Sequence, residues 1–215
     1  MRYILVILLI SFGSFAQKTR PYLGCGVYYS TDFNKSTFAD VRAGIEYKIT
    51  NYLRPEVEVN YMFGSLEDLQ SVDDIGVVLS EYFKSVAAVN YSLCPKIVLG
   101  TKDEDGASGY LQILPKYTYS RVEATGNRFS RNPSNSSTAI KESEKAIDYR
   151  HSLGIGLGWV TDFSNKNYDS IAFNVYFNNI DMGNALNRLN QERRFKTDDV
   201  LGFGVTYYFS FKKKK

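Results

Sequence analysis

LGFGVTYYFSF, residues 201–211, alternates apolar residues with small or polar ones. Successive side chains of a β-strand point to opposite faces, so one face of this stretch is apolar and ends in aromatic residues. The opposite face is mostly small and polar. In a soluble sandwich an apolar face covers a core, whereas in a membrane-spanning β-barrel it faces lipid. Together with the export signal described next, the pattern favours the barrel.

An export signal occupies the N-terminus. Arg2 precedes an apolar run, and a small-x-small cleavage site ends at Ala16, which is the layout of a secretory signal peptide. The run is well short of the ~20 apolar residues that a spanning helix needs. We expect a signal peptide over 1–16 and one outer-membrane β-barrel domain over 17–215, which ends in the short basic tail Lys212–Lys215. The expected location is the outer membrane.

Alternation with a period of two predicts the strands. It marks eight segments, at 21–30, 38–49, 52–63, 86–99, 109–121, 147–160, 169–179 and 200–211. Each is about the ~9–11 residues that a tilted transmembrane strand requires, or slightly more. The predicted fold class is all-β, an eight-stranded antiparallel up-and-down transmembrane β-barrel.

Long and short gaps separate these segments in turn, as in barrels with long extracellular loops and short periplasmic turns. The long gaps are 64–85, 122–146 and 180–199. The first is acidic and either forms a short amphipathic helix or extends its flanking strands above the membrane. The second is rich in Asn, Pro, Ser and Thr, a composition that favours mobility.

Aromatic residues gather at both ends of the predicted strands. Tyr and Trp are enriched at the two lipid–water interfaces of membrane proteins. Trp159 and Tyr207 fall at periplasmic strand ends, and Tyr61 and Tyr149 fall at the opposite ends. We therefore expect two aromatic girdles.

From Pro21 to Phe211 the chain resembles the small eight-stranded outer-membrane barrels of the OmpX and OmpA membrane-domain type, and so an outer-membrane β-barrel domain protein of the porin-like superfamily. The resemblance implies a Gram-negative cell envelope and an assembly signal in the last strand, read by the barrel assembly machinery. Gly202 stands where the family usually has a polar residue, and a lysine tail follows the last aromatic residue. The signal would be carried by Gly204, Tyr207, Phe209 and Phe211.

Charged residues share the inward face of the predicted barrel. These charges either form a pathway for ions or pair with one another and fill the lumen. We expect the second, because open channels need ~16–18 strands. Lys48 and Asp148 share this face, and the predicted lumen charge network is Arg42, Glu46, Glu56, Glu58, Lys96, Lys116 and Arg150.

Cysteine and histidine usage predicts no catalytic residue, metal site or cofactor. Strand phase sends Cys25 outward and Cys94 inward, which argues against a disulfide. His151 is the single histidine, so no zinc constellation exists. Some barrels that modify lipid A use an outward His with a Ser, but Ser152 points to the opposite face from His151. We therefore expect no enzyme.

The charge of the chain gives no evidence for nucleic-acid binding. The formal net charge is +3, and removal of Arg2 with the signal peptide leaves +2. The four terminal lysines exceed this excess, so the body is close to neutral.

The leading functional hypothesis is a non-enzymatic outer-membrane protein whose extracellular loops mediate envelope stability, adhesion or ligand contact. Its expected partners are outer-membrane lipid and lipopolysaccharide, and the barrel assembly machinery. An alternative is an accessory barrel subunit of a protein secretion or export machine, with envelope protein partners. A lipid-A-modifying enzyme ranks below both. A soluble β-sandwich or lipocalin-like barrel would reverse the faces of every strand.

Overall fold

Nine strands and one short helix make up the part of the chain that the computed structural model describes. That part comprises residues 19–30, 36–100, 109–132, 135–163, 169–177, 180–189 and 200–209, with the backbone alone at 67–69, 132 and 135–138. The predicted signal peptide, Phe211 and the lysine tail lie outside it. The elements are β1 (Thr19–Ser30), β2 (Thr37–Tyr47), β3 (Glu56–Val72), β4 (Val78–Cys94), β5 (Ile97–Leu99), β6 (Gly109–Asn132), β7 (Asn135–Asp162), β8 (Ser170–Phe177), α2 (Gly183–Asn187) and β9 (Val200–Tyr208).

The strands close into a ring. Their order is β4-β3-β2-β1-β9-β8-β7-β6-β5, and β4 also pairs with β6. β5 continues β4 after a break at Pro95 and Lys96, and both pieces pair with β6. Eight long antiparallel strands therefore form the barrel, and the predicted fold class is confirmed.

The ring is staggered. From Cys25, pairing partners followed through β2, β3 and β4 lead to Arg121 on β6. In the other direction, through β9, β8 and β7, they lead to Leu111, ten residues away on the same strand. A stagger of this kind requires the strands to tilt against the barrel axis.

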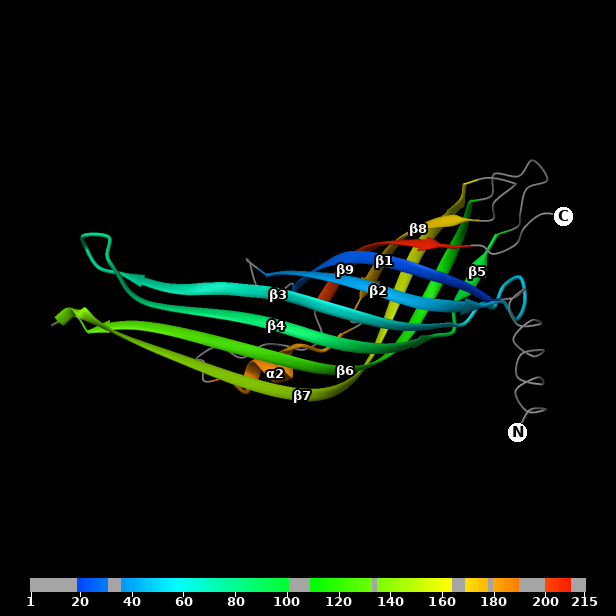
Figure 1. Ribbon diagram of the computed structural model, residues 1–215. Helices are drawn as coiled ribbons and strands as arrows, with labels where there is room; N and C mark the ends of the chain where they lie inside the picture. The colour runs from blue at the N-terminus through cyan, green and yellow to red at the C-terminus, as the bar shows by residue number, and fades with distance from the viewer. Residues whose placement is uncertain are drawn as a thin grey trace, which may run out of the picture.

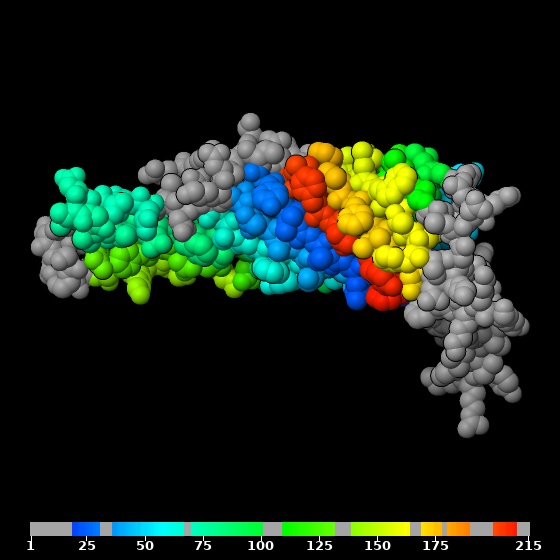
Figure 2. Space-filling model, turned by 90° about the horizontal axis from the view of Figure 1, so that it is seen from above, coloured from blue at the N-terminus to red at the C-terminus, as the bar shows by residue number. Residues whose placement is uncertain are grey.

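Side chains alternate between the two faces of the barrel wall with the predicted phase. Outward positions are apolar and exposed, with Val57 at 60% and Leu153 at 78%. Inward positions are buried and include Arg42, Glu58 and Lys116. Figure 2 shows the outer face formed by β1, β9 and β8. An apolar exterior around a charged interior is the reverse of a soluble barrel.

The first predicted loop, 64–85, takes the second of its two expected forms and extends its flanking strands, and the second predicted loop is built of strands as well. β3 and β4 run on to a turn at 73–77, where the Asp73 carboxylate accepts hydrogen bonds from the amides of Ile75 (3.0 Å) and Val77 (2.8 Å). β6 and β7 continue to Asn132 and Asn135, so the loop expected at 122–146 is wrong for its described residues, and its mobility stays a prediction. Cross-strand pairing persists along both hairpins, which satisfies their backbone groups.

These four strands project beyond the rest of the ring, at the left of Figure 1. β4 and β6 remain paired as far as Ser80 and Ser130, so the two hairpins form one sheet. Here this sheet is called the extension, and the remainder of the ring is called the barrel section. The extension comprises 64–72, 78–86, 122–132 and 135–148.

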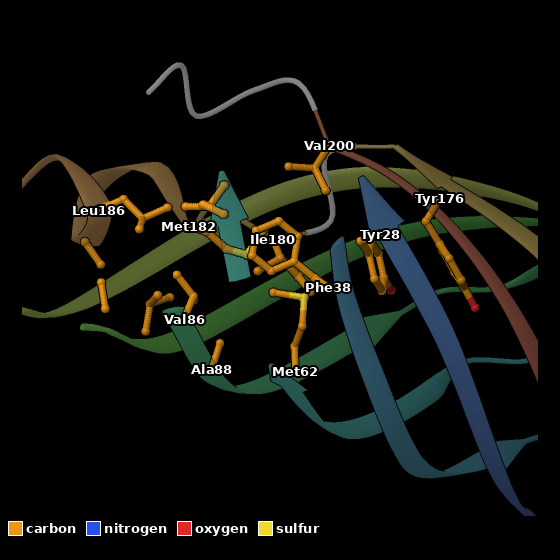
Figure 3. Close-up of a cluster of buried hydrophobic side chains, with 14 of the residues drawn as sticks. Tyr28, Phe38, Met62, Val86, Ala88, Tyr176, Ile180, Met182, Leu186 and Val200 are labelled. Atoms are coloured by element: carbon orange, nitrogen blue, oxygen red, sulfur yellow. The ribbon is translucent and has the colours of Figure 1, made fainter. Parts of the chain in front are cut away.

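The chain after β8 packs inside the extension. Figure 3 shows Ile180, Met182 and Leu186 directed toward Met62 and Val86 of the sheet. Ala185 and Leu189 are buried in the same cluster, with Val122 and Ala124 of β6. The third predicted loop is thus partly helical and closes the barrel mouth, and residues 190–199 lie outside the described part.

Smaller corrections concern strand ends. The third strand begins at Glu56, not at 52, because a turn precedes it in which the amide of Ile49 donates to the carbonyl of Leu53 (3.2 Å). Lys48, predicted on the inward face, lies beyond the end of β2 and is exposed. No helix within the described residues is long and apolar enough to cross a membrane.

Candidate functional site

The lower part of the interior is organised around Lys96. The alternation of inward residues continues past the break after Cys94, so the Lys96 side chain is buried, and its ammonium contacts Glu46 and Glu56, the latter at 2.5 Å. Arg20 pairs with Glu46 at 2.9 Å, and the Tyr208 hydroxyl donates to Glu56 at 2.8 Å. Two carboxylates thus meet two cations at the end of the barrel remote from the extension.

A second layer lies nearer the middle of the barrel. Lys116 pairs with Glu58 and Arg42 pairs with Asp40, both at 2.8 Å. The guanidinium of Arg42 lies 4.7 Å from the centre of the Tyr176 ring. All four charged groups are buried, and each has an opposite charge beside it.

Each of the two layers is neutral by itself, with two cations and two carboxylates. They hold four cationic and four anionic side chains, namely Arg20, Arg42, Lys96 and Lys116 with Asp40, Glu46, Glu56 and Glu58. Buried charges are tolerated when they are paired and hydrogen-bonded, and removal of one partner leaves the other charge buried and unpaired, which destabilises the protein. The arrangement fills the lumen and presents no surplus charge to attract an ion.

Glycines make room for the large interior side chains. Gly44 is paired with Tyr22, Gly202 with Tyr28 and Gly156 with Tyr176. A methyl group added to any of these glycines would overlap the facing ring. Gly202, an inward glycine of the last strand, is therefore a packing site for an aromatic ring.

Arg150, predicted in the same network, lies apart from it at the rim. Its Nε donates to Asp148 at 2.8 Å, and Asp148 also accepts from Asn184 (2.7 Å) and pairs with Arg188 (2.9 Å). Burial opposes ionisation of Asp148, but the hydrogen bonds from Asn184 and Arg150 and the charge of Arg188 hold its pKa below the ordinary value. We call these contacts of Asp148 the clasp; through Asn184 and Arg188 they join the segment around α2 to β7.

Sequence reasoning placed Asp148 on the inward face but missed its partners. Asn184 and Arg188 belong to a predicted loop, and no periodic signal in that loop indicates where it docks. Above the charged layers, the apolar residues of α2 and the extension close the lumen.

His151 lies on the outer face, close to the extension. The Tyr117 hydroxyl forms a hydrogen bond with the Nδ1 atom of His151 at 2.6 Å. The centroids of the Tyr119 and His151 rings are 4.9 Å apart. The neighbour of His151 is therefore a tyrosine and not a serine nucleophile. Cys25 and Cys94 are free, on the exposed outer face and in the interior respectively, as strand phase predicts.

The predicted girdle and assembly residues have defined positions. Trp159, Tyr61 and Tyr149 are exposed on the outer face. Tyr207 donates to Asp169 at 3.1 Å, next to Phe209. Gly204 faces inward beside Arg42. A role in assembly stays a prediction for these residues.

No group of three or more His, Cys, Asp or Glu side chains suited to a metal ion occurs within the described residues.

Comparison with known proteins gave matches to solved structures alone. No family model and no curated protein matches the chain. A major outer membrane protein from Thermus thermophilus is 11% identical, with a TM-score of 0.47, covering 89% of this chain and 99% of that one. Ail, the attachment invasion locus protein of Yersinia pestis, is 9% identical, with a TM-score of 0.37 and coverages of 89% and 95%. The N-terminal β-barrel domain of Pseudomonas aeruginosa OprF is 13% identical, with a TM-score of 0.32 and coverages of 90% and 98%. The fold assignment rests on the strand pairing, and these similarities assign no activity.

Proposed function

We propose that this protein is an integral outer-membrane barrel without enzymatic activity, whose extension is displayed outside the cell for surface contact. One observation carries the proposal: the two faces of the wall exchange polarity along the same strands. An exterior that is apolar at one level and polar at the next matches a wall that leaves lipid and enters water.

The exchange is clearest on β6. Up to Tyr119 its outward residues are apolar or aromatic, while Gln112, Thr118 and Ser120 point inward and are buried. From Arg121 to Asn127 the outward residues are charged or polar, and Val122 and Ala124 are buried inside.

The neighbouring strands change at the same level. Inward residues switch from Asn60 to Met62 on β3, and from Asn90 to Ala88 on β4. Tyr61 on β3 and Tyr149 on β7 lie at this level on the outer face, at the place expected of an interfacial girdle. We take the switch as the outer membrane surface.

Membrane fractionation with gel mobility tests the proposal. The protein should remain with the outer membrane through a carbonate wash, and its mobility in detergent gels should shift on boiling. Recovery in the soluble fraction without a shift would contradict it. In planar bilayers we expect no steady conductance on the nanosiemens scale, because the charged layers and the α2 segment fill the lumen.

A further inference from the structure

Three hollows follow one another along the outer surface, from the barrel section toward the tip of the extension. The lower hollow, of about 600 Å³, lies among β1, β2, β8 and β9, and its walls include Val27, Val41, Phe173, Val175, Phe203 and Val205. The middle hollow, of about 550 Å³, lies beside the first residues of β2 and includes Phe63, Ser65, Ser85, Ala87 and Thr125. The upper hollow, also about 550 Å³, is formed by β4, β6 and β7 and includes Glu81, Phe83, Asn127, Phe129, Lys141 and Ser143.

Neighbouring hollows share lining residues. Ala39 and Phe63 line both the lower and the middle hollow, and Phe83 lines both the middle and the upper one. We call this series of adjoining hollows the outer groove. From Ala87 to Glu81 on β4 the groove follows the strand for ~20 Å above the switch level, at ~3.3 Å per residue.

The chemistry of the walls changes along the groove. The lower hollow is lined mainly by aliphatic and phenylalanine side chains, the middle one by small side chains, and the upper one by polar and charged groups. The sequence of walls suits a ligand with a hydrocarbon part in the membrane and a polar chain outside it.

The upper hollow combines aromatic rings with hydrogen-bonding groups. Phe83 is paired with Asn127, and Phe129 lies between Glu81 and Lys141. The Ser143 hydroxyl donates to the Asn127 side-chain oxygen at 2.9 Å. Sugar rings offer C–H faces that pack on aromatic rings and hydroxyl groups that bond to amides, hydroxyls and carboxylates.

A positive charge lies where the groove crosses the switch level. Glu123, which lines the middle hollow, pairs with Lys145 at 2.6 Å and with Arg121 at 3.5 Å. Two cations beside one carboxylate leave one net positive charge at the height of lipid headgroups. Arg and Lys at that height attract phosphate groups.

We propose that the outer groove binds a phosphorylated glycolipid of the outer leaflet. An acyl chain occupies the lower hollow, Arg121 and Lys145 face the headgroup phosphate, and the saccharide follows Phe83 and Phe129 toward the tip. The inference rests on the proposed function, because it requires the switch level to be the membrane surface.

Native mass spectrometry of the detergent-solubilised full chain, titrated with purified rough-type lipopolysaccharide, tests the inference. The double variant Phe83→Ser, Phe129→Ser should bind about tenfold more weakly, because it removes both rings on which the saccharide packs; tenfold corresponds to about 1.4 kcal/mol. Thr125→Trp, which fills the middle hollow without removing a contact, should weaken binding by at least as much. Phe163→Ser removes an exposed aromatic ring at the opposite end of the barrel and should leave binding unchanged.

The shift of gel mobility on boiling shows for each variant whether the barrel is folded. Unchanged binding by folded groove variants would overturn the inference while leaving the proposed function intact. Equal binding of the free saccharide, or of the lipid anchor stripped of its saccharide, would overturn it as well. A wild-type chain that shows no mobility shift and does not fractionate with the membrane would instead contradict the proposed function.

Discussion

The barrel section and the extension are built from the same strands but have opposite interiors. In the barrel section the lumen holds paired charges such as Lys96 with Glu56, and the outer face is apolar. In the part of the extension nearest the barrel, Val86 and Val122 are buried under α2, and the outer face carries Glu123 and Lys145. The contrast teaches that the surrounding medium, and not the strand itself, decides which face is apolar.

Removal of Lys96 should have the largest effect on the charged interior. Lys96→Met leaves Glu46 and Glu56 without their shared cation, and breaking a buried pair in this way lowers the free energy of unfolding by about 3–5 kcal/mol. Urea unfolding in lipid vesicles measures the change. Lys145→Met, which removes an exposed cation from the extension, is the control and should change stability by under about 1 kcal/mol. Equal effects of the two variants would contradict the contrast.

A charge placed on each outer face tests the assignment of lipid and water. Val59→Arg puts a cation on the outer face near mid-barrel and should lower the free energy of unfolding by about 2–4 kcal/mol if that face is in lipid. Ala139→Arg does the same on the exposed face of the extension and should be nearly neutral. Vesicle unfolding experiments compare the pair, and a neutral Val59→Arg would argue for a soluble barrel.

Truncation of a side chain that packs α2 against the sheet should reduce protection from hydrogen exchange at the extension and leave the rest of the ring unchanged. Leu186→Ala removes a buried side chain and should weaken docking of the α2 segment by about 2–3 kcal/mol. Hydrogen exchange of residues 180–189 should accelerate, while amides of β1 and β9 keep their protection. Uniform loss of protection around the ring would show that the two regions unfold as one unit.

Acid should loosen the same contact by a smaller amount. The pKa of Asp148 is lower in the folded protein than its ordinary value, so the clasp stabilises docking at neutral pH and loses its effect as the pH falls through the folded pKa. We expect faster exchange at 180–189 in acid, by about 1 kcal/mol or less. Asp148→Asn should remove most of this pH dependence, and an unaltered pH profile would exclude the clasp as its cause.

Strand phase was readable from sequence wherever the apolar face is continuous, as from Val57 to Phe63. Extension of the strands that flank 64–85 was one of two expected forms, but the continuation of β6 was not predicted, because Val122 and Ala124 carry the apolar phase on the face opposite to that of Tyr117 and Tyr119. A strand prediction that places every apolar residue on the outer face ends the strand at this reversal. The reversal itself was the available signal.

The charged lumen was predictable for the same reason as the strand phase, and its pairings were not. Inward positions follow from alternation, but the meeting of Lys96 with Glu46 depends on the break at Pro95 and on the stagger of the ring. The docking of α2 depends on tertiary contacts that no local pattern encodes.

The α2 segment has a mechanical consequence. The extension rises from one side of the ring alone, so thermal motion would bend it about the rim as a cantilever bends about its support. Residues 180–189, packed against the sheet and joined to Asp148 by Arg188 and Asn184, brace the extension from inside. If the extension stands outside the cell as proposed, this brace sets the angle at which it leaves the membrane and fixes the orientation of its outer face.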